Sequence, residues 1–219
     1  MWGMAPFSEN VSRADKYKAL GRPLKRAIAS WADVWKPGER VKPLKIPEAL
    51  RTGSFYLGDF GQAMKLRVPM ATKQGRPPLT YCSPDRLHNK DPSFACDMWS
   101  YMCLFAELYL DYPPFHTWRN GGVVTTMVEI LGPLPEQWKG SYVNAEGSLD
   151  AWYDPNTTLR RDSLSALIER RRPETDPVER QHVLSILKKG FSYSPEERWT
   201  ATQLLQDSSF KSIIDKYCD

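Results

Sequence analysis

The chain has 219 residues, of which 41% are hydrophobic and 12% aromatic, and its formal net charge is +4. This length and apolar content suit one globular domain that buries a core without disulfides or metals, and they exclude an intrinsically disordered chain. Residues 1–50 hold ten Lys/Arg against five Asp/Glu, so the basic charge lies in this first stretch and the remainder is close to neutral.

The first half of the chain shows few regular elements. Proline and glycine recur through residues 1–50, which predicts a mostly irregular arm with one short helix over Leu24–Val34. Residues 54–58 (Ser-Phe-Tyr-Leu-Gly) favour a short strand before a turn. Four prolines in residues 66–85 predict a loop of about twenty residues, longer than a compact domain usually contains without a functional reason.

The second half is predicted to be helical. Residues 94–110 are apolar nearly all round, which predicts a helix buried on every side and ended by Pro113 and Pro114. A loop is expected over residues 140–163. The remaining apolar patterns predict helices over residues 123–131, 164–171, 178–189, 201–206 and 210–217.

Neither a membrane segment nor a Cys/His metal site is predicted. The longest apolar stretch is interrupted by Glu107, and the N-terminus has no signal peptide pattern, so an intracellular protein of the cytoplasm or nucleus is expected. The four cysteines form no C-x-x-C pair, and the three histidines lie far apart. Free thiols in a reducing compartment fit this pattern best.

Four short motifs follow one another in a fixed order. Asp59-Phe60-Gly61 comes directly after the predicted strand; alone, it could be an ordinary turn. Tyr81-Cys82-Ser83-Pro84-Asp85 begins 22 residues after Asp59, and Asp97-Met98-Trp99-Ser100 begins 12 residues after Asp85. Pro195-Glu196-Glu197-Arg198 comes shortly before the last predicted helices. The common order and spacing make coincidence a poor explanation.

These motifs resemble the later motifs of the eukaryotic protein kinases. The resemblance covers residues 52–217 and implies a mainly α fold, the helical C-terminal lobe with a short β-hairpin region, without the N-terminal lobe. Residues 1–51 would then be a basic irregular arm between the catalytic loop and the Asp-Phe-Gly triplet. Residues 126–140 are similar to the helix and insert of the CMGC group, and the whole chain is similar to fungal kinase-like proteins related to the SR-protein kinases.

The resemblance implies a role for residues near the triplet. Asp59 would bind the magnesium ion that bridges the ATP phosphates, because a hard cation prefers carboxylate oxygen. Phe60 and Gly61 would complete the triplet, and residues 62–82 would form the activation segment. Thr80, near the end of that segment, would contact the catalytic loop.

Three further residues are given structural roles by the resemblance. Asp85 stands where the family has glutamate and would pair with Arg198, and its shorter side chain is expected to loosen that pair. Asp97 would be buried and would accept hydrogen bonds from backbone N–H groups of the catalytic loop, since an unpartnered buried carboxylate is costly.

The residues that perform kinase chemistry have no match. The 58 residues before Asp59 contain no histidine and a single asparagine, Asn10, and neither a Gly-rich loop nor a His-Arg-Asp loop occurs there. The resemblance therefore implies a truncated kinase without a catalytic residue, which holds Mg and ATP poorly and is inactive alone.

Three functions remain open at this point. The chain is a piece of a serine/threonine kinase acting on a protein substrate, a non-catalytic scaffold that binds a partner protein, or a nucleic-acid binder that uses the basic arm. Nucleic acid is the least expected partner, because the basic residues are scattered without a run of aromatics. Membrane binding is not expected.

Overall fold

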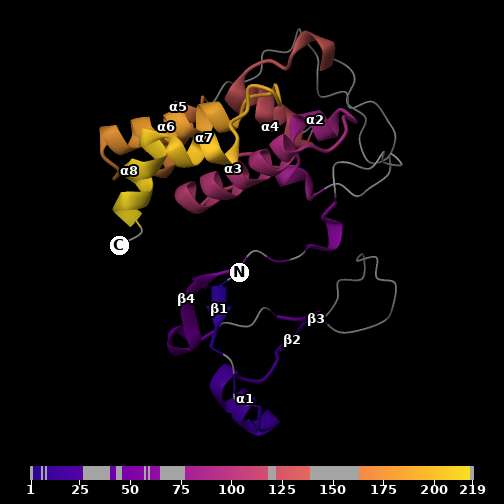
Figure 1. The fold of residues 1–219 in the computed structure, drawn as a ribbon, viewed down its shortest axis with the longest axis vertical. Helices are drawn as coiled ribbons and strands as arrows, with labels where there is room; N and C mark the ends of the chain where they lie inside the picture. The colour runs from indigo at the N-terminus through magenta and orange to yellow at the C-terminus, as the bar shows by residue number, and fades with distance from the viewer. Residues whose placement is uncertain are drawn as a thin grey trace. The chain divides into compact units, whose positions relative to one another are not determined.

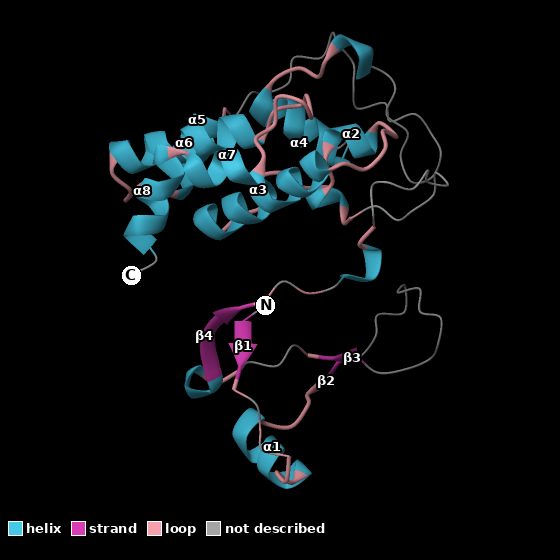
Figure 2. Ribbon diagram, viewed as in Figure 1, coloured by secondary structure: helices cyan, strands magenta, loops and turns pink. Residues whose placement is uncertain are grey.

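The computed structural model describes residues 2–5, 7, 9–26, 40–42, 46–56, 58, 60–64, 77–117, 122–138 and 163–217. The chain divides into two compact units, Met1–Ala63 and Met64–Asp219 (Figure 1). The described part is mostly helical, and its strands all belong to the first unit (Figure 2). The predicted mainly α fold is therefore confirmed, whereas the domain boundary between residues 51 and 52 stays a prediction.

Two antiparallel strand pairs organise the first unit. Strand β1 (Trp2–Met4) pairs with β4 (Arg51–Phe55), and β2 (Lys25–Arg26) pairs with β3 (Arg40–Val41). The strand predicted over residues 54–58 starts and ends earlier, because its register is set by pairing with β1. The helix predicted over Leu24–Val34 is wrong at Lys25–Arg26, which form β2, and residues 27–39 lie outside the described residues.

Helix α1 (Arg13–Leu20) depends on its caps. The Ser12 hydroxyl accepts a hydrogen bond from the Asp15 N–H at 3.1 Å, which satisfies one of the free donors of the first turn. Gly21 ends the helix at φ 79°, a conformation that other residues rarely adopt. None of the helix residues is buried, so tertiary packing contributes little to its stability.

The second unit contains the predicted helices. They are α2 (Pro84–Leu87), α3 (Phe94–Leu110), α4 (Gly122–Leu131), α5 (Leu164–Arg171), α6 (Pro177–Gly190), α7 (Ala201–Gln206) and α8 (Ser208–Tyr217), with short 3-10 turns η3 (Leu79–Tyr81) and η4 (Glu136–Trp138). The loop predicted over residues 66–85 is interrupted by η3 and by α2, which has Ser83 as its N-cap residue and Pro84 in its first turn. The loop predicted over residues 140–163 lies almost wholly outside the described residues.

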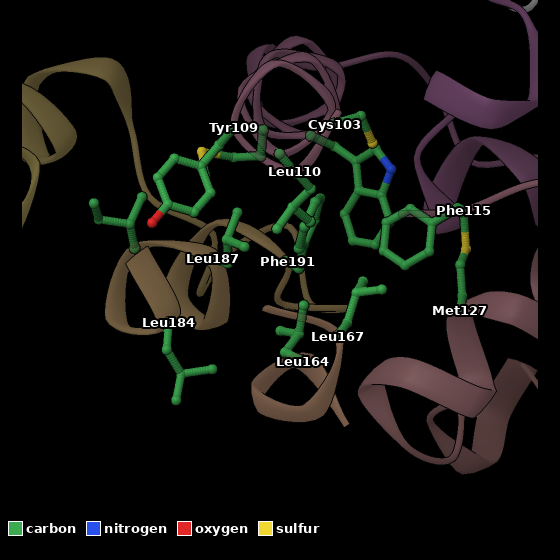
Figure 3. Close-up of a cluster of buried hydrophobic side chains, with 14 of the residues drawn as sticks. Cys103, Tyr109, Leu110, Phe115, Met127, Leu164, Leu167, Leu184, Leu187 and Phe191 are labelled. Atoms are coloured by element: carbon green, nitrogen blue, oxygen red, sulfur yellow. The ribbon is translucent and has the colours of Figure 1, made fainter. Parts of the chain in front are cut away.

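An aromatic cluster forms the centre of the second unit. The rings of Trp99 and Phe115 stack with centroids 5.3 Å apart, and the edge of Phe191 meets both. Figure 3 shows Phe115 and Phe191 among leucines of α5 and α6. Large aromatic side chains contribute much of the apolar area that such a core buries, so this cluster fixes α3 against the helices that follow it.

Helix α3 departs from the sequence prediction on one side. Its core face carries Trp99, Met102, Cys103 and Ala106, all buried. The opposite face is exposed, so the prediction that this helix is buried on every side is wrong. Its residues are apolar nearly all round, but the elements that pack against it, α6 and η3, leave the opposite face exposed. In the described part of the chain, no helix is long and apolar enough to cross a membrane.

The end of α6 passes very close to α3. Gly190, the last residue of α6, is buried, and a Cβ placed there would overlap the Met102 side chain, with Sδ at 2.8 Å and Cε at 2.9 Å. Contacts this short do not occur between real side chains. Glycine at this position therefore allows Met102 to fill the space between the two helices.

We expect Gly190→Ala to lower the free energy of unfolding by about 1–3 kcal/mol, the usual cost of overpacking, although alanine is intrinsically the better helix former. In a Met102→Ala background, which removes the overlapping atoms, the same substitution should be neutral or stabilising. Urea unfolding of the four chains checks both statements. An equal cost of Gly190→Ala in the two backgrounds would contradict the steric explanation.

Candidate functional site

A buried ion pair joins two motifs that are far apart in the sequence. The Arg198 Nη2 donates to Asp85 Oδ1 at 2.8 Å, and the two side chains are 0% and 2% exposed. Asp85 lies in α2, whereas Arg198 lies in the turn between α6 and α7. The predicted pairing is present, and it attaches the segment before α3 to the C-terminal helices.

Arg198 has acceptors for its other donors as well. Its Nη1 donates to the Ala95 carbonyl at 2.7 Å, at the start of α3, and its Nε donates to the Ser192 carbonyl at 3.1 Å. The guanidinium also lies over the ring of Trp99, 5.1 Å from its centroid, which favours the cation. A buried charge is tolerated only when it is paired and hydrogen-bonded, and Arg198 meets both conditions.

Asp85 is equally well satisfied. Its Oδ2 accepts hydrogen bonds from the Ser83 hydroxyl at 3.1 Å and from the Cys96 thiol at 3.0 Å. Burial by itself raises the pKa of Asp85, but Arg198 and the hydrogen bond from Cys96 outweigh it, so the pKa of Asp85 lies below its ordinary value of 3.8. The expectation that the short aspartate loosens the pair is wrong, because α2 brings the carboxylate within direct contact of Arg198.

The stretch before α2 is fastened to α3 at Tyr81. The Tyr81 hydroxyl donates to Glu107 Oε2 at 2.7 Å, and the Ser100 hydroxyl donates to the Tyr81 carbonyl at 2.8 Å. The hydrogen bond to Glu107, together with burial, raises the pKa of Tyr81 to about 12. Thr80 is half-buried beside Tyr81 in η3, and its predicted contact with a catalytic loop stays a prediction.

A histidine holds the far end of α2. His88 is buried, its Nδ1–H donates to the Pro84 carbonyl at 2.6 Å, and its ring stacks on Trp138 of η4 at 4.9 Å. Burial lowers the pKa of His88, which favours the neutral ring. The segment Leu79–His88 is therefore attached to α3, to Arg198 and to η4.

Asp97 does not lie where the sequence predicts. It is exposed on the outer face of α3, because it falls on the side opposite the buried Trp99. Among the described residues no hydrogen-bond partner for its carboxylate is found, so the predicted buried, partnered carboxylate is wrong for this chain as it stands.

The residues proposed for magnesium are only partly described. Phe60 and Gly61 form a 3-10 turn, η2 (Phe60–Gln62), in the first unit, and Phe60 is exposed. Asp59 lies outside the described residues. Within the described ranges, no group of three or more His, Cys, Asp or Glu residues could hold a metal ion. The role of Asp59 as a magnesium ligand therefore stays a prediction.

Sequence reasoning missed several members of the site. Cys96 and Ser83 complete the shell of Asp85, but neither residue type signals such a role. The position of Glu107 could have indicated its role, because a charged residue inside an apolar helix needs a hydrogen-bond or ion-pair partner. The free-thiol prediction is confirmed for Cys82, Cys96 and Cys103, of which Cys82 and Cys103 are buried.

Comparison with known proteins agrees with the motifs. The family model described as "Protein kinase domain" matches residues 47–210. The human dual specificity protein kinase CLK2 is 30% identical over 139 residues, which is 61% of this chain and 27% of that protein. The Arabidopsis thaliana serine/threonine-protein kinase AFC2 is 30% identical over 144 residues, or 59% of this chain and 32% of that protein.

A third relative is matched over more of the chain. The Arabidopsis thaliana serine/threonine-protein kinase AFC3 is 27% identical over 176 residues, which is 74% of this chain and 42% of that protein. The chain therefore spans less than half the length of these relatives. The predicted resemblance to kinases of the CMGC group is confirmed.

We expect Asp85→Asn to lower the free energy of unfolding by about 3–5 kcal/mol at pH 7, because it leaves Arg198 buried without its counter-charge. The pKa of Asp85 is depressed in the folded chain, so its contribution is complete above about pH 4 and is lost as the pH falls through the folded pKa. Urea unfolding measured from pH 7 to pH 3 should therefore show that the difference in unfolding free energy between wild type and Asp85→Asn becomes smaller at acid pH.

The control for this experiment is Asp215→Asn, a substitution at an exposed carboxylate on α8. It should change stability by less than about 0.5 kcal/mol at every pH. If the difference in unfolding free energy between wild type and Asp85→Asn stayed constant down to pH 3, the negative charge of Asp85 would not be the source of the stability that the pair provides.

Proposed function

The chain belongs to the protein kinase family, and from this premise we propose that it is the helical lobe of a serine/threonine protein kinase that does not transfer phosphate as the 219-residue polypeptide. The family's reaction moves a phosphoryl group from ATP to a protein hydroxyl, with magnesium neutralising the phosphates. The proposal assigns this chain the part of the domain that holds the activation segment and supports protein substrates.

The observation that carries the proposal is the attachment of Leu79–His88. The Asp85–Arg198 pair, the Tyr81–Glu107 hydrogen bond and the His88–Trp138 stack hold this segment on three sides. Because Leu79–His88 is held in this way, it is suited to form a rigid surface at the end of the activation segment. Positioning a substrate for reaction requires precise geometry, and a rigid surface provides it. These contacts are an ion pair, a hydrogen bond and a ring stack, and the proposal gives them the role of positioning the segment.

The proposed inactivity of the 219-residue polypeptide is supported by the residues that its sequence supplies for catalysis. No catalytic aspartate, no magnesium-binding asparagine and no Gly-rich loop can be recognised before Asp59. A single carboxylate gives magnesium one protein ligand, and such sites usually combine carboxylates with the phosphates of a well-held nucleotide. Asp59 alone is therefore too weak a site for Mg and ATP.

A second candidate function is a non-catalytic, partner-binding module. It is favoured by one observation, the exposed apolar face of α3, with Leu108 85% and Phe94 76% exposed. Large contiguous patches of exposed apolar side chains are typical of interaction surfaces. Both candidates describe the same structure, and they differ in whether the lobe acts within a catalytic kinase or as a binding partner only.

Incubation of the purified chain with labelled ATP, magnesium and a mixture of Ser-, Thr- and Tyr-containing peptides tests the proposal. We expect phosphate transfer at the background level, unchanged by Asp59→Ala, with human CLK2 as the positive control. Transfer that requires magnesium and disappears in Asp59→Ala would contradict the proposal and identify Asp59 as a working metal ligand.

A further inference from the structure

A groove lies between α5 and α6, and none of the residues that line it belongs to the site described above. Its volume is about 360 Å³, which falls within the range of small-molecule sites. The two helices pack side by side (Figure 1). Ser165, Ile168 and Glu169 line the groove from one face of α5, since they are three and four residues apart. We call this cavity the α5–α6 groove.

The floor of the α5–α6 groove is apolar. Its two buried lining residues are Ile168 of α5, 1% exposed, and Leu184 of α6, 9% exposed. Pro177, in the first turn of α6, adds an exposed ring to the same lining. An apolar group placed on this floor leaves water, which is favourable. The groove therefore suits a ligand with an apolar part.

The two walls of the groove carry opposite charges that do not pair with each other. Glu169 comes from α5 and Arg180 from α6. Within the described residues, the Arg180 guanidinium has no hydrogen-bond or ion-pair partner, and the Glu169 carboxylate accepts only from the Ser165 hydroxyl, at 3.5 Å. Arg180 is half-buried, so its charge has lost part of its water without gaining a counter-charge. A ligand that supplies this counter-charge is favoured.

The two charges select among small ligands. One carboxylate is too few for a magnesium or calcium ion, because these ions take several oxygen ligands. A simple anion would pair with Arg180 but would be repelled by Glu169, and a simple cation would pair with Glu169 but would be repelled by Arg180. A ligand that carries both a negative and a positive charge pairs with both walls at once.

We propose that the α5–α6 groove binds a small zwitterion with a large apolar side chain, the chemical class to which the free apolar amino acids belong. The carboxylate of the ligand pairs with Arg180, and its ammonium group pairs with Glu169. Its side chain lies on Ile168 and Leu184. Gln181, which is exposed, adds a neutral amide to the lining. The inference goes beyond the proposed lobe function and does not rest on it.

A set of matched ligands provides the test. The probe is L-phenylalanine, titrated against the full chain and followed by ligand-observed NMR. Three analogues each lack one feature: L-phenylalaninamide lacks the carboxylate, N-acetyl-L-phenylalanine lacks the ammonium group, and glycine lacks the side chain. We expect saturable binding of L-phenylalanine with a dissociation constant below about 1 mM, and binding of each analogue at least about tenfold weaker.

Variants of the chain locate the site. Arg180→Gln should weaken binding of L-phenylalanine at least about tenfold and should remove its advantage over the amide. Glu169→Gln should remove the advantage of L-phenylalanine over its N-acetyl derivative. Lys211→Gln is the control, at an exposed residue of α8 that does not line the groove, and it should change neither. Far-UV circular dichroism verifies that each variant is folded, and the comparison of ligands on the wild-type chain does not depend on any variant.

Three results would overturn the inference. They are no binding of L-phenylalanine, equal binding of L-phenylalanine and its amide, and equal binding of L-phenylalanine to Arg180→Gln and wild type. Thermal unfolding gives a second readout, because a ligand that binds only the folded chain stabilises it. Saturating L-phenylalanine should raise the Tm of the wild-type chain, whereas an unchanged Tm would contradict the inference. The phosphate-transfer assay contains no amino acid ligand, so failure here and failure of the proposed lobe function are distinguishable.

Discussion

The ion pair between Asp85 and Arg198 is the constraint on which the second unit depends. Both charges are withdrawn from water, and each is tolerable only because the other is present and because Ser83, Cys96 and the carbonyl of Ala95 complete their hydrogen bonds. The pair brings together α2, the start of α3 and the turn before α7. Removing one partner would leave a buried charge, so these elements are expected to lose their arrangement together.

Around that pair, α3 has two different faces. The inner face joins the aromatic cluster through Trp99, whose ring also lies under the Arg198 guanidinium, so the ion pair and the apolar core share a side chain. Gly190 leaves the space that Met102 fills. The outer face is exposed, with Leu104 and Leu108 on it beside Asp97. One helix thus holds Tyr81 on one side and leaves its opposite face exposed.

The sequence predicted the helices of the second unit well, because the spacing of apolar residues and stops such as Pro113 and Pro114 are local signals. It also predicted the Asp85–Arg198 pair, through family resemblance rather than from a sequence pattern.

The sequence did not predict that Asp97 and the outer face of α3 are exposed. The apolar composition of a helix does not say which of its sides have neighbours. The shell formed by Ser83 and Cys96 could not be predicted, since it requires the actual position of α2 against α3. For Asp59, outside the described residues, the metal role rests on resemblance alone.

A double-mutant cycle on Asp85 and Arg198 tests the central constraint most directly. The free energy of unfolding would be measured for wild type, Asp85→Asn, Arg198→Met and the double variant. Since each single substitution leaves a buried charge or its hydrogen-bond shell without a partner, we expect the double variant to be more stable than additivity predicts, by at least about 2 kcal/mol. If the loss of unfolding free energy in the double variant equalled the sum of the two single losses to within about 0.5 kcal/mol, the claim that this pair holds the lobe together would be contradicted.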